Sequence, residues 1–230
     1  MILLAVLTVP VSGLTQPIPV PRQKPLAQAP IPPAQVPWSA AEIETAQSEC
    51  KAMLDGLPIV FTAAKAIGGP QGCGAAAPVL VNAVDGVKLN PPATLTCTMA
   101  RYLHLWVTTS LQPAAQAKLG TGVTEIKTAS SYVCRGRNNL SGGKLSEHGK
   151  ANALDMAGFA FGRSAAVSIS DGWGPGAEAA ASGEQSFLEA VRLGACTQFT
   201  TVLGPGSDPY HGDHFHVDAI QRKNDYRICQ

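Results

Sequence analysis

The first clear alternation of hydrophobic and polar residues along the chain is a helical one that begins at Ser39. Glu42 follows three residues later, a spacing typical of a capping box at a helix N-terminus. Apolar positions such as Ile43 and Cys50 then recur on one side of the predicted helix. We expect this helix to end at about Leu54.

Residues 58–90 have a different pattern, in which short apolar runs alternate with glycine and proline. Runs such as Val79–Val81 predict short strands. Pro91 and Pro92 then introduce a second helical pattern over about residues 95–117. Its apolar positions at helical spacing are Met99, Leu103, Trp106 and Val107.

A third helix is predicted over about residues 183–193. Ser182 and Gln185 have the spacing of an N-terminal cap, and Gly194 suits the C-terminal end. Strand patterns cover about residues 123–128, 154–161, 166–169, 200–203 and 214–219. Because there is no repeated β-α-β period and no glycine-rich phosphate loop, we expect an α+β fold. It would be a small, mainly antiparallel sheet with flanking helices and many loops.

The N-terminal part of the chain does not fit this domain pattern. Residues 1–15 contain the apolar run Met1–Gly13, which is shorter than the roughly 20 residues of a membrane-spanning helix. The run resembles the core of an export signal, although the positive residues that usually precede one are missing. Residues 16–37 are proline-rich and predict an extended spacer. The domain therefore covers residues 38–230, and we expect no transmembrane span in the mature protein.

The charge composition argues against nucleic acid as a partner. Charged residues make up 14% of the chain and the net charge is +1, with no basic stripe to contact phosphates.

The cysteines carry more information. There are 6 of them, spread through the domain without a CxxC pair: Cys50, Cys73, Cys97, Cys134, Cys196 and Cys229.

Dispersed cysteines in an even number favour three disulfides over a cysteine-rich zinc knot. Six cysteines allow 15 connectivities, so the sequence does not fix the pairing. Our hypothesis is that Cys196 pairs with Cys229 and closes the last segment onto the domain. Disulfides indicate an oxidising compartment, so we expect an exported protein of the periplasm or cell envelope.

Two short segments hold all the histidines except His104, which we interpret as a surface or hydrogen-bonded core residue. The first segment is Ser146–Asp155, in which His148 and Asp155 are seven residues apart. These two side chains can meet if His148 ends a loop and Asp155 lies on the strand that follows. A metal ion would then close the loop between them.

The second segment is His211–Asp218. Successive side chains of a strand point to opposite faces, so His214 and His216 would share one face while Phe215 and Val217 pack into the core. Two histidines and one aspartate with room for water form the open arrangement of a catalytic zinc site. The two segments together therefore predict one divalent-metal site, with zinc as the metal.

These segments resemble known motifs. The first reads SEHGKANALD and is similar to the SxHxxGxAxD motif of the lysostaphin/D-Ala-D-Ala metallopeptidase group, and DHFHVD is similar to that group's HxH motif. The domain as a whole resembles the bacterial extensin-like C-terminal family, on the segments GCG at 72–74, YVCRGRN at 132–138 and TVLGPG at 201–206. The motif's internal glycine is Ala151 here, which concerns the shape of the loop more than the ligand spacing.

The resemblance implies a fold like that of the metallopeptidase group, with His148, Asp155 and His216 as zinc ligands. It implies a catalytic role for His214. Related enzymes with an ExWH motif place a carboxylate three residues before the last ligand, and Asp213 occupies that position. We therefore keep Asp213 as the alternative base.

Other polar residues near the motifs have open roles. The group often uses an arginine to bind substrate or to stabilise the oxyanion. Arg135 and Arg137 are the candidates for this role, and the alternative is that they are solvated loop charges. We interpret Ser146 as a structural hydrogen-bonding residue. Asp218 is expected to orient a histidine, and His211 to do the same or to line the substrate cleft.

The sequence thus predicts an exported zinc peptidase that hydrolyses stem-peptide or cross-link amide bonds of peptidoglycan. The main alternative is a cell-wall-binding module that keeps the metal site without turnover. A structural wall protein like plant extensins ranks last, because the proline tract is short and has no regular repeat.

Overall fold

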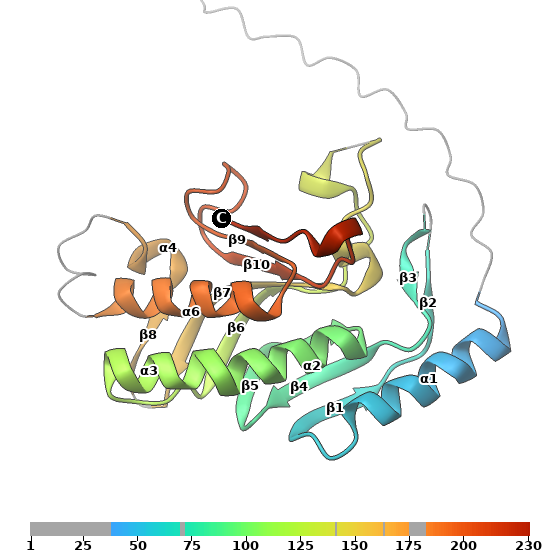
Figure 1. Cartoon of the computed structure of the whole chain (residues 1–230), viewed down its shortest axis with the longest axis horizontal. Helices are drawn as coiled ribbons and strands as arrows, with labels where there is room; N and C mark the ends of the chain where they lie inside the picture. Colours follow the sequence, from blue (N-terminus) through green and yellow to red (C-terminus); the bar gives the residue numbers. More distant parts are fainter. Residues whose placement is uncertain (1–37, 70–71, 141, 163, 175–182) are drawn as a thin grey trace, which may run out of the picture. The chain divides into compact units, whose positions relative to one another are not determined.

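The computed structural model in Figure 1 describes residues 38–69, 72–140, 142–162, 164–174 and 183–230. The predicted export-signal segment, the proline-rich spacer and the cap at Ser182 lie outside these ranges. Inside them, no helix combines the length and the apolar character that crossing a membrane would need.

The domain is built on one central sheet. Its strands follow one another in space as β1 (Ile59–Ala63), β4 (Val79–Val84), β5 (Val87–Leu95), β6 (Glu125–Ser130), β7 (Ala153–Phe161), β10 (Phe215–Asp218), β9 (Thr201–Leu203) and β11 (Ile228–Cys229). β8 (Ser164–Ser168) also pairs with β7, and a separate ribbon joins β2 (Ile67–Gly68) to β3 (Gly74–Ala75). The predicted strands are therefore present, with ends shifted by one or two residues. The last of them, however, begins after His214.

The sheet is mixed, so the expectation of a mainly antiparallel sheet is wrong. β5 runs parallel to β6, and β9 runs parallel to β11. Between β5 and β6 the chain crosses over through a long helical segment, and such a crossover returns the chain in its original direction. A single crossover of this kind produces no repeated β-α-β period, so the sequence pattern did not reveal it.

Helices cover one face of the sheet (Figure 1). The crossover consists of α2 (Cys97–Trp106), a π-helical turn η2 (Val107–Leu111) and α3 (Gln112–Leu119), and it lies beside α6 (Glu184–Gln198). The other helical elements named within the described residues are α1 (Ala40–Leu54), α4 (Ile169–Gly172), and the 3-10 turns η3 (Arg137–Asn139), η4 (Glu147–Lys150) and η5 (Lys223–Asp225). The capping box at the start of α1 is confirmed, because Ser39 and Glu42 bond to each other's backbone amides.

The core fills the space between these helices and the sheet. The predicted apolar face of the second helix is confirmed, since Met99, Leu103, Trp106 and Val107 are all fully buried. The Trp106 ring packs near Phe159 and Phe199, with ring centroids 6.3 Å away in each case. Its indole Nε1–H donates to the Val191 carbonyl of α6, so this large side chain buries no unpaired donor.

The expectation that Pro91 and Pro92 introduce the second helix is wrong, because both prolines lie inside β5. The helix begins later, at Cys97, where the side chain of Thr96 accepts a hydrogen bond from the Met99 amide. Prolines are tolerated in β5 because its pairing with β4 is irregular there. The register passes from Val81 opposite Ala93 to Ala83 opposite Lys88, so the prolines have no ladder partner on β4.

Gly194 does not end the third helix, because α6 continues to Gln198. Its role is close packing. A Cβ atom at position 194 would lie 2.4 Å from Cβ of Ser110 in η2, so only glycine lets the two helical segments approach this closely.

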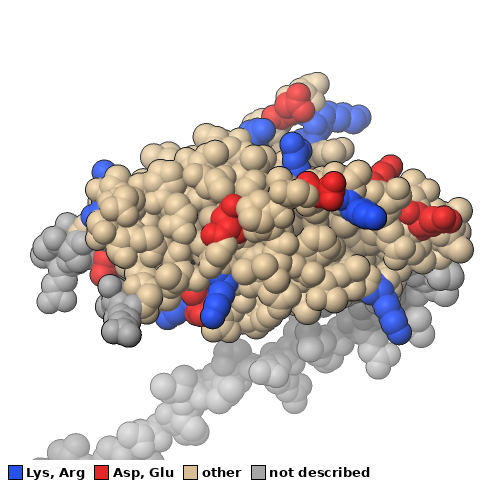
Figure 2. Space-filling model, turned by 90° about the horizontal axis from the view of Figure 1, so that it is seen from below, with Lys and Arg blue, Asp and Glu red and all other residues tan. Residues whose placement is uncertain are grey.

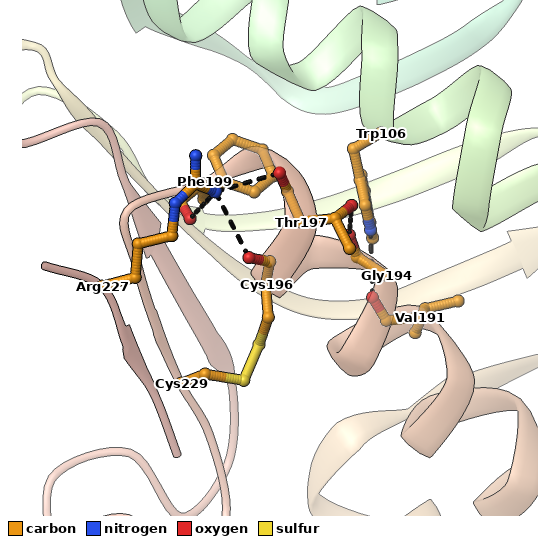
Figure 3. The surroundings of a disulfide bond; sticks show 8 residues. All are labelled: Trp106, Val191, Gly194, Cys196, Thr197, Phe199, Arg227 and Cys229. Atoms are coloured by element: carbon orange, nitrogen blue, oxygen red, sulfur yellow. Dashed lines mark hydrogen bonds between the residues drawn. A yellow bond between two sulfur atoms is a disulfide. The ribbon is translucent and has the colours of Figure 1, made fainter. Parts of the chain in front are cut away.

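All six cysteines form disulfides: Cys50–Cys97, Cys73–Cys134 and Cys196–Cys229. The predicted Cys196–Cys229 pair is confirmed. Figure 3 shows how it ties the C-terminal strand to the end of α6. Beside it, the Arg227 guanidinium donates to the carbonyl of Thr197 at 2.9 Å, a favourable position for a cation at a helix C-terminus.

Charged side chains are sparse on the face shown in Figure 2. Lysine and arginine are interspersed there with aspartate and glutamate, and uncharged residues occupy most of that face. This view agrees with the low charge content of the chain.

Candidate metal centre

Three buried side chains converge where η4 meets strands β7 and β10. His148 Nε2 lies 3.1 Å from Asp155 Oδ1, and His216 Nδ1 lies 2.8 Å from the same oxygen. The two ring nitrogens are 3.2 Å apart. The structure thus brings together all three predicted ligands, although His216 is 61 residues from Asp155 in the sequence.

Strand register explains why Asp155 and His216 meet. β7 and β10 are antiparallel, and Asp155 is the direct partner of His216 in the ladder. Directly opposed residues project to the same face of a sheet. Phe215 and Val217 point to the other face and are buried in the core, as the alternation of the sequence predicted.

The turn η4 delivers His148 to this pair. Its first amides are capped by Ser146, whose hydroxyl accepts from the His148 amide at 3.4 Å, so the structural role predicted for Ser146 agrees with its contacts. The turn ends at Ala151, which has the left-handed φ of 54°. Glycine adopts that conformation most readily. Ala151 therefore has a backbone conformation that glycine, the residue at this place in the similar motif, adopts readily, and His148 Nε2 faces Asp155.

Hydrogen bonds on the far side of each ring set its orientation. His148 Nδ1 lies 2.5 Å from the carbonyl oxygen of Ser131, which accepts a hydrogen bond from Nδ1–H. The other ring nitrogen, Nε2, therefore faces the cluster. His216 Nε2 lies 3.4 Å from Asp218 Oδ2, so Nδ1 faces the cluster. Asp218 thus has the contact expected of a residue that orients a histidine.

The cluster is electrostatically suited to a cation. Burial alone would raise the pKa of the Asp155 carboxyl, but hydrogen bonds from His148 and His216 hold this pKa well below its usual range. Burial alone would lower the pKa of His216, but Asp155 and Asp218 raise it to about 9. A proton on His216 would therefore balance the negative charge of the buried Asp155 carboxylate when no other cation lies beside it.

The donor set also fits a metal ion. One ligand atom from each of the three side chains lies within 4.8 Å of the others, and the residues are only 1%, 5% and 9% exposed. Two imidazoles and one carboxylate, with their outer atoms held by further hydrogen bonds, are typical ligands of a divalent transition metal. His148, Asp155 and His216 would hold it.

His214 lies at the rim of the cluster. Its Nε2 is 3.7 Å from Asp155 Oδ1, farther than the corresponding atoms of His148 and His216. Its Nδ1 is 2.7 Å from Asp213 Oδ1, and the Asp213 side chain is 76% exposed. Asp213 therefore contacts His214 rather than the three converging side chains.

His211 has a carboxylate partner that the sequence analysis missed. Its Nδ1 lies 2.8 Å from Asp208 Oδ1, which also accepts from the Tyr210 amide. Burial lowers the pKa of His211, although Asp208 opposes this effect. The His211 ring is 5.2 Å from that of His214 and 5.6 Å from that of His216. An aspartate three residues before a histidine, in a turn, was the available signal for this pair.

The two candidate arginines differ in position. Arg135 Nη2 lies 4.0 Å from Asp155 Oδ2, so its guanidinium reaches the edge of the cluster. Arg137 is more exposed than Arg135 and also lines the cleft. His104, by contrast, is remote from the cluster and bonds through Nδ1 to Asp85 at 2.6 Å, in agreement with its interpretation as a structural residue.

The cluster opens into a cleft of about 370 Å³. Its lining is mainly polar. Residues that the sequence analysis did not assign to it include Asn138, Asn139, Thr201, Asp208, Tyr210 and Arg222. Asn138 and Asn139 belong to the short turn η3 and Thr201 begins β9, whereas Asp208, Tyr210 and Arg222 lie in the loops on either side of β10. Such turns and loops carry no periodic signal in a sequence.

No curated protein and no solved structure matches this chain. A family model does. The model described as extensin-like protein C-terminus matches residues 48–230, which include the whole cluster and all six cysteines. The chain therefore belongs to the family of the extensin-like protein C-terminus.

Proposed function

We propose that this protein is a zinc-dependent peptidase that hydrolyses amide bonds in the peptides of peptidoglycan. The observation that carries the proposal is the convergence of His148, Asp155 and His216 at a polar cleft, with the ring of His214 at its rim. The similarity of both motifs to those of the lysostaphin/D-Ala-D-Ala metallopeptidase group supports the same reading.

A zinc ion held by His148, Asp155 and His216 would supply Lewis acidity for the scissile carbonyl and would lower the pKa of a water molecule. The protein contributes the orientation of these ligands. The Ser131 carbonyl and the Asp218 carboxylate each hold the outer nitrogen of one ring, so both inner nitrogens remain directed at Asp155.

His214 is the proposed proton carrier. Its Nδ1 is bonded to Asp213, so Nε2 is the nitrogen that accepts a proton at the cleft and later donates it to the leaving amine. The Asp213 carboxylate stabilises the imidazolium formed in between. This division of roles favours His214 over Asp213 as the base, because Asp213 is directed at His214 and is largely exposed.

Arg135 is the proposed substrate-binding cation. Its guanidinium lies close to Asp155, where it can hold a carbonyl or carboxylate oxygen of a peptide beside the reacting bond. Arg137 also lines the cleft, at an exposed position, and would contact another part of the same peptide.

The proposed substrate follows from chemistry and compartment. Three disulfides are typical of proteins outside the cytoplasm, and in the bacterial envelope peptidoglycan is the abundant peptide polymer. A polar, arginine-containing cleft suits short peptides that carry free carboxylates.

The test is metal analysis of the purified protein, followed by mass spectrometry of muropeptides incubated with it. We expect one zinc per chain and peptide cleavage that stops with a chelator and returns with zinc. Zinc binding and retention on cell walls without cleavage would instead support the wall-binding module. Absence of stoichiometric metal, even after addition of zinc, would refute both.

A further inference from the structure

The segment that orients His148 has no regular secondary structure of its own. Residues 131–136 run between β6 and η3, and only Gly136 forms a bridge, to Leu145. The segment nevertheless makes two hydrogen bonds to His148. The Ser131 carbonyl accepts from His148 Nδ1, and the Val133 amide donates to the His148 carbonyl at 3.3 Å.

The same segment also reaches the rest of the centre. The Arg135 carbonyl accepts from the Ser146 amide at 3.1 Å, just before η4. The Arg135 side chain extends to Asp155. A displacement of this segment would therefore change both the His148 ring and the arginine at the edge of the cleft.

One covalent bond holds the middle of the segment. Cys134 is joined to Cys73, which lies just before β3 and is completely buried. A Cβ atom on Gly149 would lie 3.1 Å from Cys73 Sγ, and one on Gly69 would lie 3.6 Å from Cys134 Sγ. The disulfide is thus packed between the backbone at Gly69 and the backbone at Gly149, and Gly149 is the residue next to His148.

We propose that the Cys73–Cys134 disulfide is a positioning group of the metal centre. It holds the Ser131 carbonyl against His148 Nδ1 and so keeps Nε2 as the nitrogen that faces Asp155. The proposal rests on the proposed function in so far as it requires that the cluster bind metal. Loss of the outer hydrogen bond to a metal-binding histidine typically weakens metal binding by about 10–100-fold.

The Cys196–Cys229 disulfide provides a matched control. It closes a loop in the same domain, but its neighbours in Figure 3 are residues of α6, the C-terminal strand and the core, and none of them is a proposed ligand. The double variant Cys196→Ser/Cys229→Ser should lower the melting temperature and leave the zinc dissociation constant unchanged within about threefold, as expected for a distant site.

The experiment compares Cys73→Ser/Cys134→Ser with that control and with the unmodified chain. Zinc dissociation constants come from competition with a chromophoric chelator, melting temperatures from circular dichroism, and the His148 tautomer from nitrogen-15 spectra of the imidazoles. We expect zinc binding about 10–100-fold weaker in Cys73→Ser/Cys134→Ser alone, together with loss of the Nδ1–H tautomer of His148. Equal zinc affinity in the two double variants, at similar melting temperatures, would overturn the proposal.

Two further measurements keep the outcomes separate. If Cys73→Ser/Cys134→Ser does not fold, stepwise reduction of the unmodified chain by a dithiol takes its place, with the opened disulfide identified by mass spectrometry. Cys134 is exposed whereas Cys73 is completely buried, so the reagent would approach this bond from the side of Cys134. If the unmodified chain binds no zinc, the proposed function fails, and an unchanged His148 tautomer after reduction would then overturn the positioning role independently.

Discussion

His214 and His216 are two residues apart, yet their contacts assign them different tasks. His216 Nδ1 is 2.8 Å from Asp155, while His214 Nε2 is 3.7 Å away and its Nδ1 is held by Asp213. We expect His216→Ala to lose both metal and turnover. His214→Ala should retain its metal while turnover falls by about 10²–10⁴-fold, the usual contribution of a general acid–base. Zinc content and muropeptide turnover of the same preparations measure this.

Asp213→Ala is the control for this pair. Because Asp213 acts on His214 from the solvent side, its removal should retain metal and reduce turnover less than His214→Ala does. A metal-loaded but inactive Asp213→Ala, with an active His214→Ala, would identify Asp213 as the base. Equal loss of zinc from His214→Ala and His216→Ala would show that both rings are ligands.

Asp218 offers a second test at the level of one residue. Its carboxylate lies beside His216 Nε2 and also accepts from the Ile220 amide at 3.1 Å. Asp218→Asn preserves the size of the side chain but removes its charge, so His216 becomes a poorer ligand. We expect zinc affinity to fall by about 10-fold or more, measured by chelator competition. Asp171→Asn, at an exposed position, should leave the affinity unchanged, and a similar loss in both variants would contradict this role.

The positions of the three proposed ligands could be predicted from sequence where the geometry is local. Strand alternation places His216 on the opposite face from Phe215 and Val217, and a turn followed by a strand brings His148 to Asp155. Ser131 could not be predicted, because its contribution is a backbone carbonyl that lies near His148 only after folding. Side-chain type carries no information about such a contact.

Among the elements, local signals predicted the beginnings of helices only where the cap itself was local. The Ser39 capping box marks α1 correctly. Pro91 and Pro92 were misleading, because a pair of prolines before an apolar pattern resembles a helix start, whereas tertiary pairing places them in β5 beside an irregular stretch of β4. Gly194 was misleading for the same reason, since its neighbour Ser110 is distant in sequence.

The close contact of α6 with η2 leads to a prediction about Gly194. Alanine is favoured over glycine inside a helix by about 1 kcal/mol. A Cβ atom here would lie 2.4 Å from Ser110 Cβ, and overpacking of this kind costs about 1–3 kcal/mol. The difference of these two effects predicts that Gly194→Ala destabilises the protein by up to about 2 kcal/mol, measured by urea unfolding.

Ser110→Gly should relieve the clash and recover part of the stability of Gly194→Ala, which a double-mutant cycle would detect. An increase in stability of the single variant Gly194→Ala would mean that the two helical segments can move apart without loss of stability. Close packing would then not be the reason for glycine at position 194.

For the molecule as a whole, composition predicted the class of fold better than its topology. Dispersed cysteines indicated three disulfides, and the structure forms three. The direction of the strands was not predictable in the same way. A parallel pair depends on where a crossover returns the chain, and the pairings of β5 with β6 and of β9 with β11 depend on the whole domain.

The three disulfides lead to the last prediction, which concerns the stability of the whole domain. They join residues separated by 47, 61 and 33 positions, and they connect α1 to α2, the residue before β3 to the segment beside His148, and α6 to β11. Loop closure of this length restricts the unfolded chain by about 4 kcal/mol for each bond in the chain-entropy model. Together these contributions are comparable with the total stability of a typical domain, about 5–15 kcal/mol.

We therefore expect the fully reduced chain to be largely unfolded at 25 °C at neutral pH, while the oxidised chain remains folded. Circular dichroism and urea titration with and without a dithiol, and with alkylation of the freed thiols, measure this. A cooperative urea transition of the reduced and alkylated chain at the midpoint of the oxidised one would contradict it, and would show that the core between the helices and the sheet is sufficient by itself.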